Sequence, residues 1–159
     1  MENRKIVDIE DLIAWKKAKD LSILVYKLIK NNSEIQRDYS FCDQLRRAAI
    51  SVPLNIAEGF GRGGNKEFIN FLGIATGSLL ELKTIILIGC EIDFISIEDK
   101  NKLLLNIVEI ERIIKGLQNY LKKTEHKGYK YNKVEEDEVE YRLNERDTLL
   151  STLNSQLST

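Results

Sequence analysis

Residues 68–86 read FINFLGIATGSLLELKTII, and their spacing decides the fold. Apolar residues recur at intervals of three and four positions, at Phe68, Leu72, Ala75, Leu79, Leu82 and Ile86. Side chains at this spacing line one side of an α-helix, so the stretch predicts a helix with an apolar seam. A seam of this kind is stable only when other helices cover it, because an isolated helix leaves it in water.

Three further stretches show the same spacing. Their seams are Ala14, Ala18, Leu21, Val25 and Leu28; then Leu45, Ala49, Val52 and Ile56; and finally Leu103, Ile107, Ile110, Ile114, Leu117 and Leu121. Four helices joined by short connections bury such seams most simply as an antiparallel bundle. We therefore predict an all-α fold, an up-down antiparallel four-helix bundle.

The expected helix ends are marked by polar residues and glycine. Asn31–Ser33 would end the first helix, and Gly59–Gly64 would separate the second helix from the third. Asn65 and Ser96 are placed to cap the third and fourth helices. Pro53 lies inside the second helical pattern and removes a backbone hydrogen bond, so it predicts a kink there.

The charge changes towards the C-terminus. Residues 129–159 hold four basic and seven acidic residues, whereas the preceding 128 residues hold 20 basic and 18 acidic ones. We divide the chain into a four-helix bundle (1–124) and an acidic C-terminal extension (125–159). The leucines at Leu143, Leu150, Leu153 and Leu157 leave two interpretations open. The extension is either a partly ordered tail or a short fifth helix that docks on a partner.

The sequence offers little catalytic or metal chemistry. Its one histidine is His126, and its two cysteines, Cys42 and Cys90, are too far apart for a metal-binding motif. Ser/His/Asp and Cys/His arrangements are therefore excluded. We predict no metal, no cofactor and no enzymatic activity. Two cysteines without a disulfide pattern fit a reducing cytoplasm.

A glycine motif and a long apolar stretch suggest a nucleotide site and a membrane span, but their sequence contexts argue against both. Gly59, Gly61 and Gly64 satisfy G-x-G-x-x-G, but a helical pattern precedes them where a dinucleotide site needs a strand. The longest apolar stretch is interrupted by Glu81 and Lys83, so we expect no membrane span, and the first residues show no apolar leader.

A group of cations is the strongest candidate for binding. It comprises Arg46, Arg47, Arg62 and Lys66. Such a group would suit phosphates, although a net charge of −1 excludes a strongly basic nucleic-acid binder. The alternative is that Arg46 or Arg47 pairs with Glu58 or Glu81 between helices.

Polar and small residues in the second and third helices suggest structural roles. Asn55 and Glu58 follow Ser51 at helical spacing, which is typical of residues that hydrogen-bond across helices or at a subunit interface. Gly73 and Gly77 are four positions apart, a spacing that favours close helix approach.

Residues 44–53 (QLRRAAISVP) and 55–62 (NIAEGFGR) resemble the signature of the 23S rRNA intervening-sequence proteins, a bacterial family of four-helix bundles. The similarity continues through Glu67–Phe68 and Gly77–Leu82, and the first helix, with Asp11-Leu12 and Trp15, is also similar. It covers residues 8–123.

This resemblance implies a ring-like homopentamer whose biochemical activity is not established. A distant branch resembles the accessory proteins of diversity-generating retroelements, which bind nucleic acid together with a reverse transcriptase. By the resemblance, the cation group would contact RNA or DNA, and Asn55, Glu58 and Glu81 would organise the bundle or its interfaces. The expected partners are thus further copies of the chain, RNA or DNA bound weakly, and a protein such as a reverse transcriptase. The alternative is a protein-interaction scaffold that binds no nucleic acid.

Overall fold

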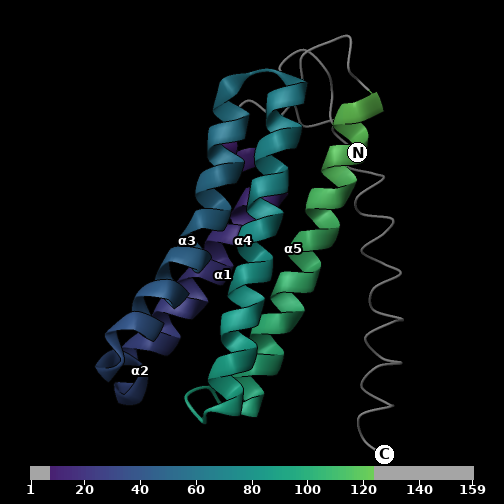
Figure 1. Ribbon diagram of the computed structural model, residues 1–159. Coiled ribbons are helices and arrows are strands. Elements are labelled where there is room, and N and C mark those ends of the chain that lie inside the picture. Colours follow the sequence, from purple (N-terminus) through teal and green to yellow (C-terminus); the bar gives the residue numbers. More distant parts are fainter. Residues whose placement is uncertain (1–7, 124–159) are drawn as a thin grey trace, which may run out of the picture. The chain divides into compact units, whose positions relative to one another are not determined.

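The structure is a computed structural model that describes residues 8–123 (Figure 1). A 3₁₀ turn, η1 (Ile9–Asp11), precedes five α-helices. They are α1 (Ile13–Lys30), α2 (Ser33–Arg37), α3 (Tyr39–Arg62), α4 (Asn65–Glu91) and α5 (Ile97–Lys123). No strand occurs in this part of the chain, and the predicted all-α fold is confirmed. The predicted C-terminal extension lies outside the described residues.

The four long helices lie side by side (Figure 1). Helix α3 packs against α1 and α4, and α5 also packs against α1 and α4, so α1 and α4 occupy opposite corners. Side-chain hydrogen bonds connect the ends of neighbouring helices. The side-chain amide of Asn32 donates to the Phe94 carbonyl (2.7 Å), and the side-chain amide of Asn65 donates to the Leu121 carbonyl (3.1 Å).

The predicted seams form the core. Every seam residue of α3, α4 and α5 is buried. In α1, Ile29 is buried and Leu28 only partly so, which corrects the last position of the first seam. A straight helix turns once every 3.6 residues, so a repeat of 3.5 drifts off the buried side along its length. The next buried residue after Val25 is therefore Ile29, four positions on, and not Leu28.

Two helix boundaries differ from the prediction. Gly59 and Gly61 lie inside α3, which ends at Arg62, and Gly63 follows in the left-handed conformation (φ 80°) that glycine adopts most readily. Asn65 does not cap α4, because Gly64 holds that position and the buried Asn65 side chain reaches α5 instead. The predicted cap at Ser96 is confirmed by its hydrogen bond from the Asp99 amide (3.0 Å).

Helix α2 is an addition that the seams did not predict. The Asn32 side chain accepts hydrogen bonds from the amides of Glu34 and Ile35, and so starts this short helix. Pro53 lies inside α3, which continues over Tyr39–Arg62. The kink expected at Pro53 and the up-down order of the helices stay predictions.

Gly59 of α3 plays the opposite role to Gly73 and Gly77 of α4. A Cβ atom on Gly59 would lie 2.6 Å from the Phe71 Cβ and 2.8 Å from a Phe68 ring carbon, so this glycine allows α3 to approach α4. A Cβ atom on Gly73 or Gly77 would meet nothing within 4 Å. The prediction that these two glycines pack tightly is therefore wrong within the described bundle, since they face outward.

Gly59→Ala should lower the free energy of unfolding by about 1–3 kcal/mol, because the added methyl group meets the Cβ of Phe71 and the helices must separate. Gly61→Ala is the matched control on the same helix, since a Cβ there meets nothing within 4 Å. It should be neutral or stabilise by up to about 1 kcal/mol through helix propensity. Urea denaturation followed by circular dichroism measures both. Equal losses in the two variants would contradict the close approach at Gly59.

Candidate functional site

The four candidate cations form two separate groups on the bundle. Arg46 and Arg47 lie in the first half of α3, and Arg62 and Lys66 flank the turn between α3 and α4. Arg46 and Arg62 lie sixteen positions apart on α3, which amounts to about 24 Å along the axis. Arg62 and Lys66 are thus four positions apart across the turn, and the structure keeps Arg46 well apart from Arg62.

Two of these arginines pair with carboxylates of their own helix. The Arg62 guanidinium lies 2.6 Å from Glu58 and 5.7 Å above the Phe71 ring. Arg47 lies 3.9 Å from Asp43, with both side chains largely exposed. An exposed pair contributes about 0–1 kcal/mol, so a phosphate can displace the carboxylate at low cost. The predicted pairing of Arg46 or Arg47 with Glu58 or Glu81 between helices is wrong for the described chain.

The polar residues singled out in α3 connect it to α4. The Asn55 amide donates to the Ser51 carbonyl (2.8 Å) and to the Ser51 hydroxyl (3.0 Å). That hydroxyl in turn lies 2.9 Å from the Ser78 hydroxyl of α4. Glu58 holds Arg62, whereas Glu81 is exposed on α4. Asn55 thus acts on the helix pair through Ser51.

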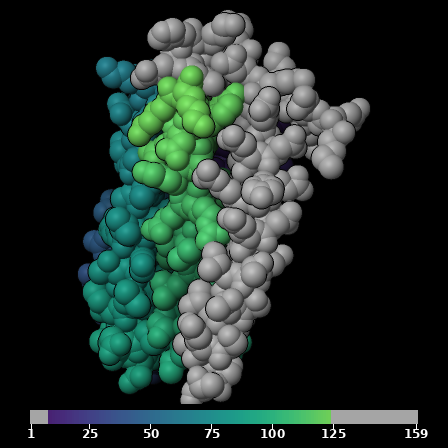
Figure 2. Space-filling model, turned by 90° about the vertical axis from the view of Figure 1, so that its right-hand side faces the viewer, coloured from purple at the N-terminus to yellow at the C-terminus, as the bar shows by residue number. Residues whose placement is uncertain are grey.

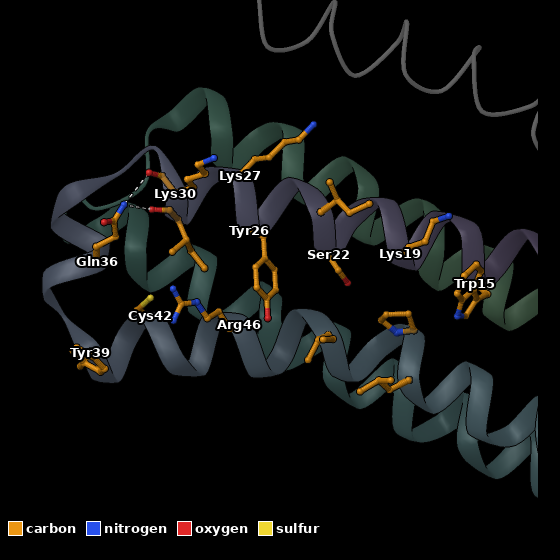
Figure 3. Close-up of a pocket in the computed structure, with 15 residues that line it drawn as sticks. Trp15, Lys19, Ser22, Tyr26, Lys27, Lys30, Gln36, Tyr39, Cys42 and Arg46 are labelled. Carbon is orange, nitrogen blue, oxygen red and sulfur yellow. Dashed lines mark hydrogen bonds between the residues drawn. The ribbon is translucent and has the colours of Figure 1, made fainter. Parts of the chain in front are cut away.

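A groove of about 870 Å³ runs between α1 and α3, and we call it the α1–α3 groove (Figure 3). Ile23 on α1 and Ile50 and Leu54 on α3 leave exposed apolar surface along it. Its cations are Lys19, Lys27, Lys30 and Arg46, and no described residue that lines it is acidic. Tyr26 extends from α1 towards α3, where Arg46 lies (Figure 3).

The three lysines of this groove are absent from the cation group predicted from the sequence. Lys19, Lys27 and Lys30 lie on a second stripe of α1, together with Ile23 and Tyr26, at steps of three and four residues. That stripe is the sequence signal that could have predicted the lysines of the groove. It is hard to recognise because the apolar seam on the buried side of α1 has the same period.

Helix α4 also carries an outward-facing apolar strip, which we call the α4 outer face. It comprises Gly73, Ile74, Gly77, Leu80, Glu81, Thr84, Leu87 and Ile88. Ile74 and Leu80 are each 52% exposed, and Ile88 is 50% exposed. Helix α4 is apolar on two sides, because the buried seam runs along its other side. Figure 2 shows α4 and α5 forming one surface of the bundle.

The apolar character of α4 bears on the expectation that the chain has no membrane span. The helix is long and apolar enough to cross a membrane, by length and composition alone. The two charges Glu81 and Lys83 do not exclude this. A single such helix is weak evidence for a membrane, because the helices of a soluble bundle pass the same test.

Metal chemistry finds no support in the described residues. Between residues 8 and 123 no group of three or more histidine, cysteine or acidic residues could hold a metal ion. Cys42 and Cys90 are free thiols. His126 lies outside the described residues.

The fold and these surfaces define an α-helical bundle with one cationic, partly apolar groove and one exposed apolar helix face. A family model described as 23S rRNA-intervening sequence protein matches residues 10–116, and the chain belongs to this family. A solved structure from Bacteroides thetaiotaomicron, of a protein with unknown function from the S23 ribosomal protein family, has a similar fold. It is 20% identical, with a TM-score of 0.60, over 67% of this chain and 98% of that chain. No curated protein matches.

The hydrogen bond between Ser51 and Ser78 can be tested by a double-mutant cycle. The coupling energy of Ser51→Ala with Ser78→Ala should be about 0.5–1.5 kcal/mol in urea denaturation, because the two hydroxyls satisfy each other at the half-buried contact of α3 with α4. The control pair is Ser51→Ala with Thr84→Ala, since Thr84 bonds only to the Leu80 carbonyl of its own helix. Its coupling should be near zero, and equal values for the two pairs would refute the assignment.

Proposed function

We propose that this protein is a non-enzymatic adaptor that assembles with itself and binds RNA or DNA weakly. Self-assembly is supported by the α4 outer face. Three large aliphatic side chains there are half-exposed, and two glycines leave the helix backbone open to a partner. Contiguous exposed apolar surface is typical of a protein–protein interface. Assembly is the function that this geometry supports best.

The family resemblance supports a ring of five chains. Symmetric rings arise when two different surfaces of each subunit meet, and one chain here offers more than one apolar surface. The two free thiols fit a reducing compartment such as the bacterial cytoplasm. The family membership and the S23 structure of unknown function supply no catalytic precedent.

Nucleic-acid binding is supported by the exposed cations. Arg47, Arg62 and Lys66 are exposed, and the carboxylates that face the two arginines are exposed as well. Few cations per chain set a low affinity, because each neutralised phosphate contributes only one released counterion. A protein-interaction scaffold without nucleic-acid binding is the second candidate. It is favoured by the near-zero net charge of −1.

Light scattering coupled to size exclusion tests assembly. The wild-type chain of 18.3 kDa should elute as a ring of five, about 92 kDa. Leu80→Asp places a charge in the middle of the α4 outer face and should give monomers with an unchanged circular dichroism spectrum, since Leu80 is exposed within one chain. A monomeric wild-type protein at micromolar concentration would contradict the proposal.

Fluorescence anisotropy of labelled structured RNA and duplex DNA at two salt concentrations tests the proposed nucleic-acid binding. We expect dissociation constants of about 10⁻⁴–10⁻⁶ M. Arg62→Ala/Lys66→Ala should reduce the salt slope by about two per chain engaged, and Arg46→Ala/Arg47→Ala by about one, because Arg46 lines the α1–α3 groove. Lys102→Ala/Lys115→Ala on α5 removes the same charge elsewhere and serves as the control.

Absence of binding at low salt would leave the scaffold as the function. Equal effects of all three double variants would mean that binding follows the total charge of the protein, without a defined site.

A further inference from the structure

Two exposed apolar surfaces of the bundle differ in shape, one being a groove and the other the surface of a single helix. The α1–α3 groove is concave and is lined by Ile23, Ile50 and Leu54. The α4 outer face is the surface of a single helix, and at Gly73 and Gly77 no Cβ projects from it. A helix without side chains at two successive turns can enter a groove more deeply, because its backbone replaces the missing methyl groups.

The two surfaces also match in length. The groove extends along α1 from Trp15 to Lys30, and the α4 outer face extends from Gly73 to Ile88. Each stretch rises about 22 Å, at about 1.5 Å per residue. One helix is therefore long enough to span the groove.

The charges of the two surfaces are opposite. Lys19, Lys27, Lys30 and Arg46 line the groove without any acidic residue among the described lining. Glu81 is the one charged side chain of the α4 outer face, and it lies midway between Gly73 and Ile88. A cationic groove and a helix with a central carboxylate attract each other.

We propose that the α4 outer face of one chain docks into the α1–α3 groove of a second copy. This rests on the proposed self-assembly and specifies its geometry. Pairing of two α4 outer faces fits less well, because a symmetric antiparallel pair would bring Glu81 against Glu81 of the partner. It would also leave the apolar groove uncovered.

Such an interface joins two different surfaces of each chain. Because α1 and α4 occupy opposite corners of the bundle, a docked chain still offers its own groove to the next one. The contact therefore repeats from copy to copy and closes into a ring when the rotation allows. It covers Arg46 and leaves Arg47, Arg62 and Lys66 for phosphates.

Mixing of two variants tests this geometry in the full chain. Leu80→Asp removes the α4 outer face but keeps the groove, and Ile50→Asp removes the groove but keeps the α4 outer face. Both residues are exposed within one chain, so both variants should fold, as circular dichroism checks. Each variant alone should be a monomer. An equimolar mixture should form a 1:1 dimer of about 37 kDa, because one intact contact remains.

Val108→Asp on α5 is the control, since Val108 is similarly exposed but belongs to neither surface. It should assemble as the wild type does. A 1:1 dimer in the mixture, with an assembled control, supports the docking.

Other results would overturn it. If Ile50→Asp assembles like the wild type, the groove takes no part and self-assembly stands without this geometry. Monomers in the mixture, or loss of assembly in Val108→Asp, would point to another interface. A wild type that is monomeric but sediments with vesicles of phosphatidylcholine and phosphatidylglycerol would assign the α4 outer face to lipid, and the proposed assembly would fail as well.

Discussion

The close packing of α3 against α4 is the constraint on which the other features depend. Gly59 of α3 lies against Phe68 and Phe71 near one end of this interface, and Gly89 of α4 lies against Phe41 near the other. Between them the Ser51 and Ser78 hydroxyls meet at 2.9 Å. The contacts pair later residues of α3 with earlier residues of α4, so these two helices run in opposite directions. These contacts fix the rotation of α4 about its axis, and that rotation turns Gly73 and Gly77 outward.

The rotation of α3 has a similar consequence on its other side. With Leu45, Ala49, Val52 and Ile56 buried in the core, Arg46, Ile50 and Leu54 fall beside α1 and line the groove. The buried Ser22 hydroxyl of α1 lies 2.7 Å from the Ala49 carbonyl, which holds α1 against this part of α3. The two surfaces proposed for docking thus follow from how the core is packed.

The sequence was sufficient for the fold class because an apolar period of 3.6 residues identifies the side of a helix that is buried. It does not identify what covers that side, so glycines of the same spacing could not be told apart. Gly59 admits a neighbouring helix and Gly61, two residues on, faces open space. Asn65 illustrates the same limit, since a cap position and a contact with α5 look alike in the chain. Helix α2 is too short to show a period.

The candidate site was predictable only in part. Proximity in sequence grouped Arg46 with Arg62, yet about 24 Å of helix separates them. Conversely, Arg46 is distant in sequence from Lys19, Lys27 and Lys30, yet the fold places all four in the same groove. Side chains from different helices meet according to helix rotation and register, and neither is encoded in the spacing of one helix. The polar link from Asn55 through Ser51 to Ser78 joins positions 27 residues apart in the same way.

A small number of cations per chain and a binding function are compatible once the chain assembles. In the proposed assembly each chain would leave Arg47, Arg62 and Lys66 exposed, and a single set of three cations binds phosphate weakly. A ring repeats the set in a fixed arrangement, so the second and later contacts with one nucleic acid are intramolecular. Linked contacts of this kind raise the overall affinity by about 10²–10⁴ without any new contact type. In the proposed assembly, the apolar surfaces that join the chains would therefore also determine how tightly the few cations hold a nucleic acid.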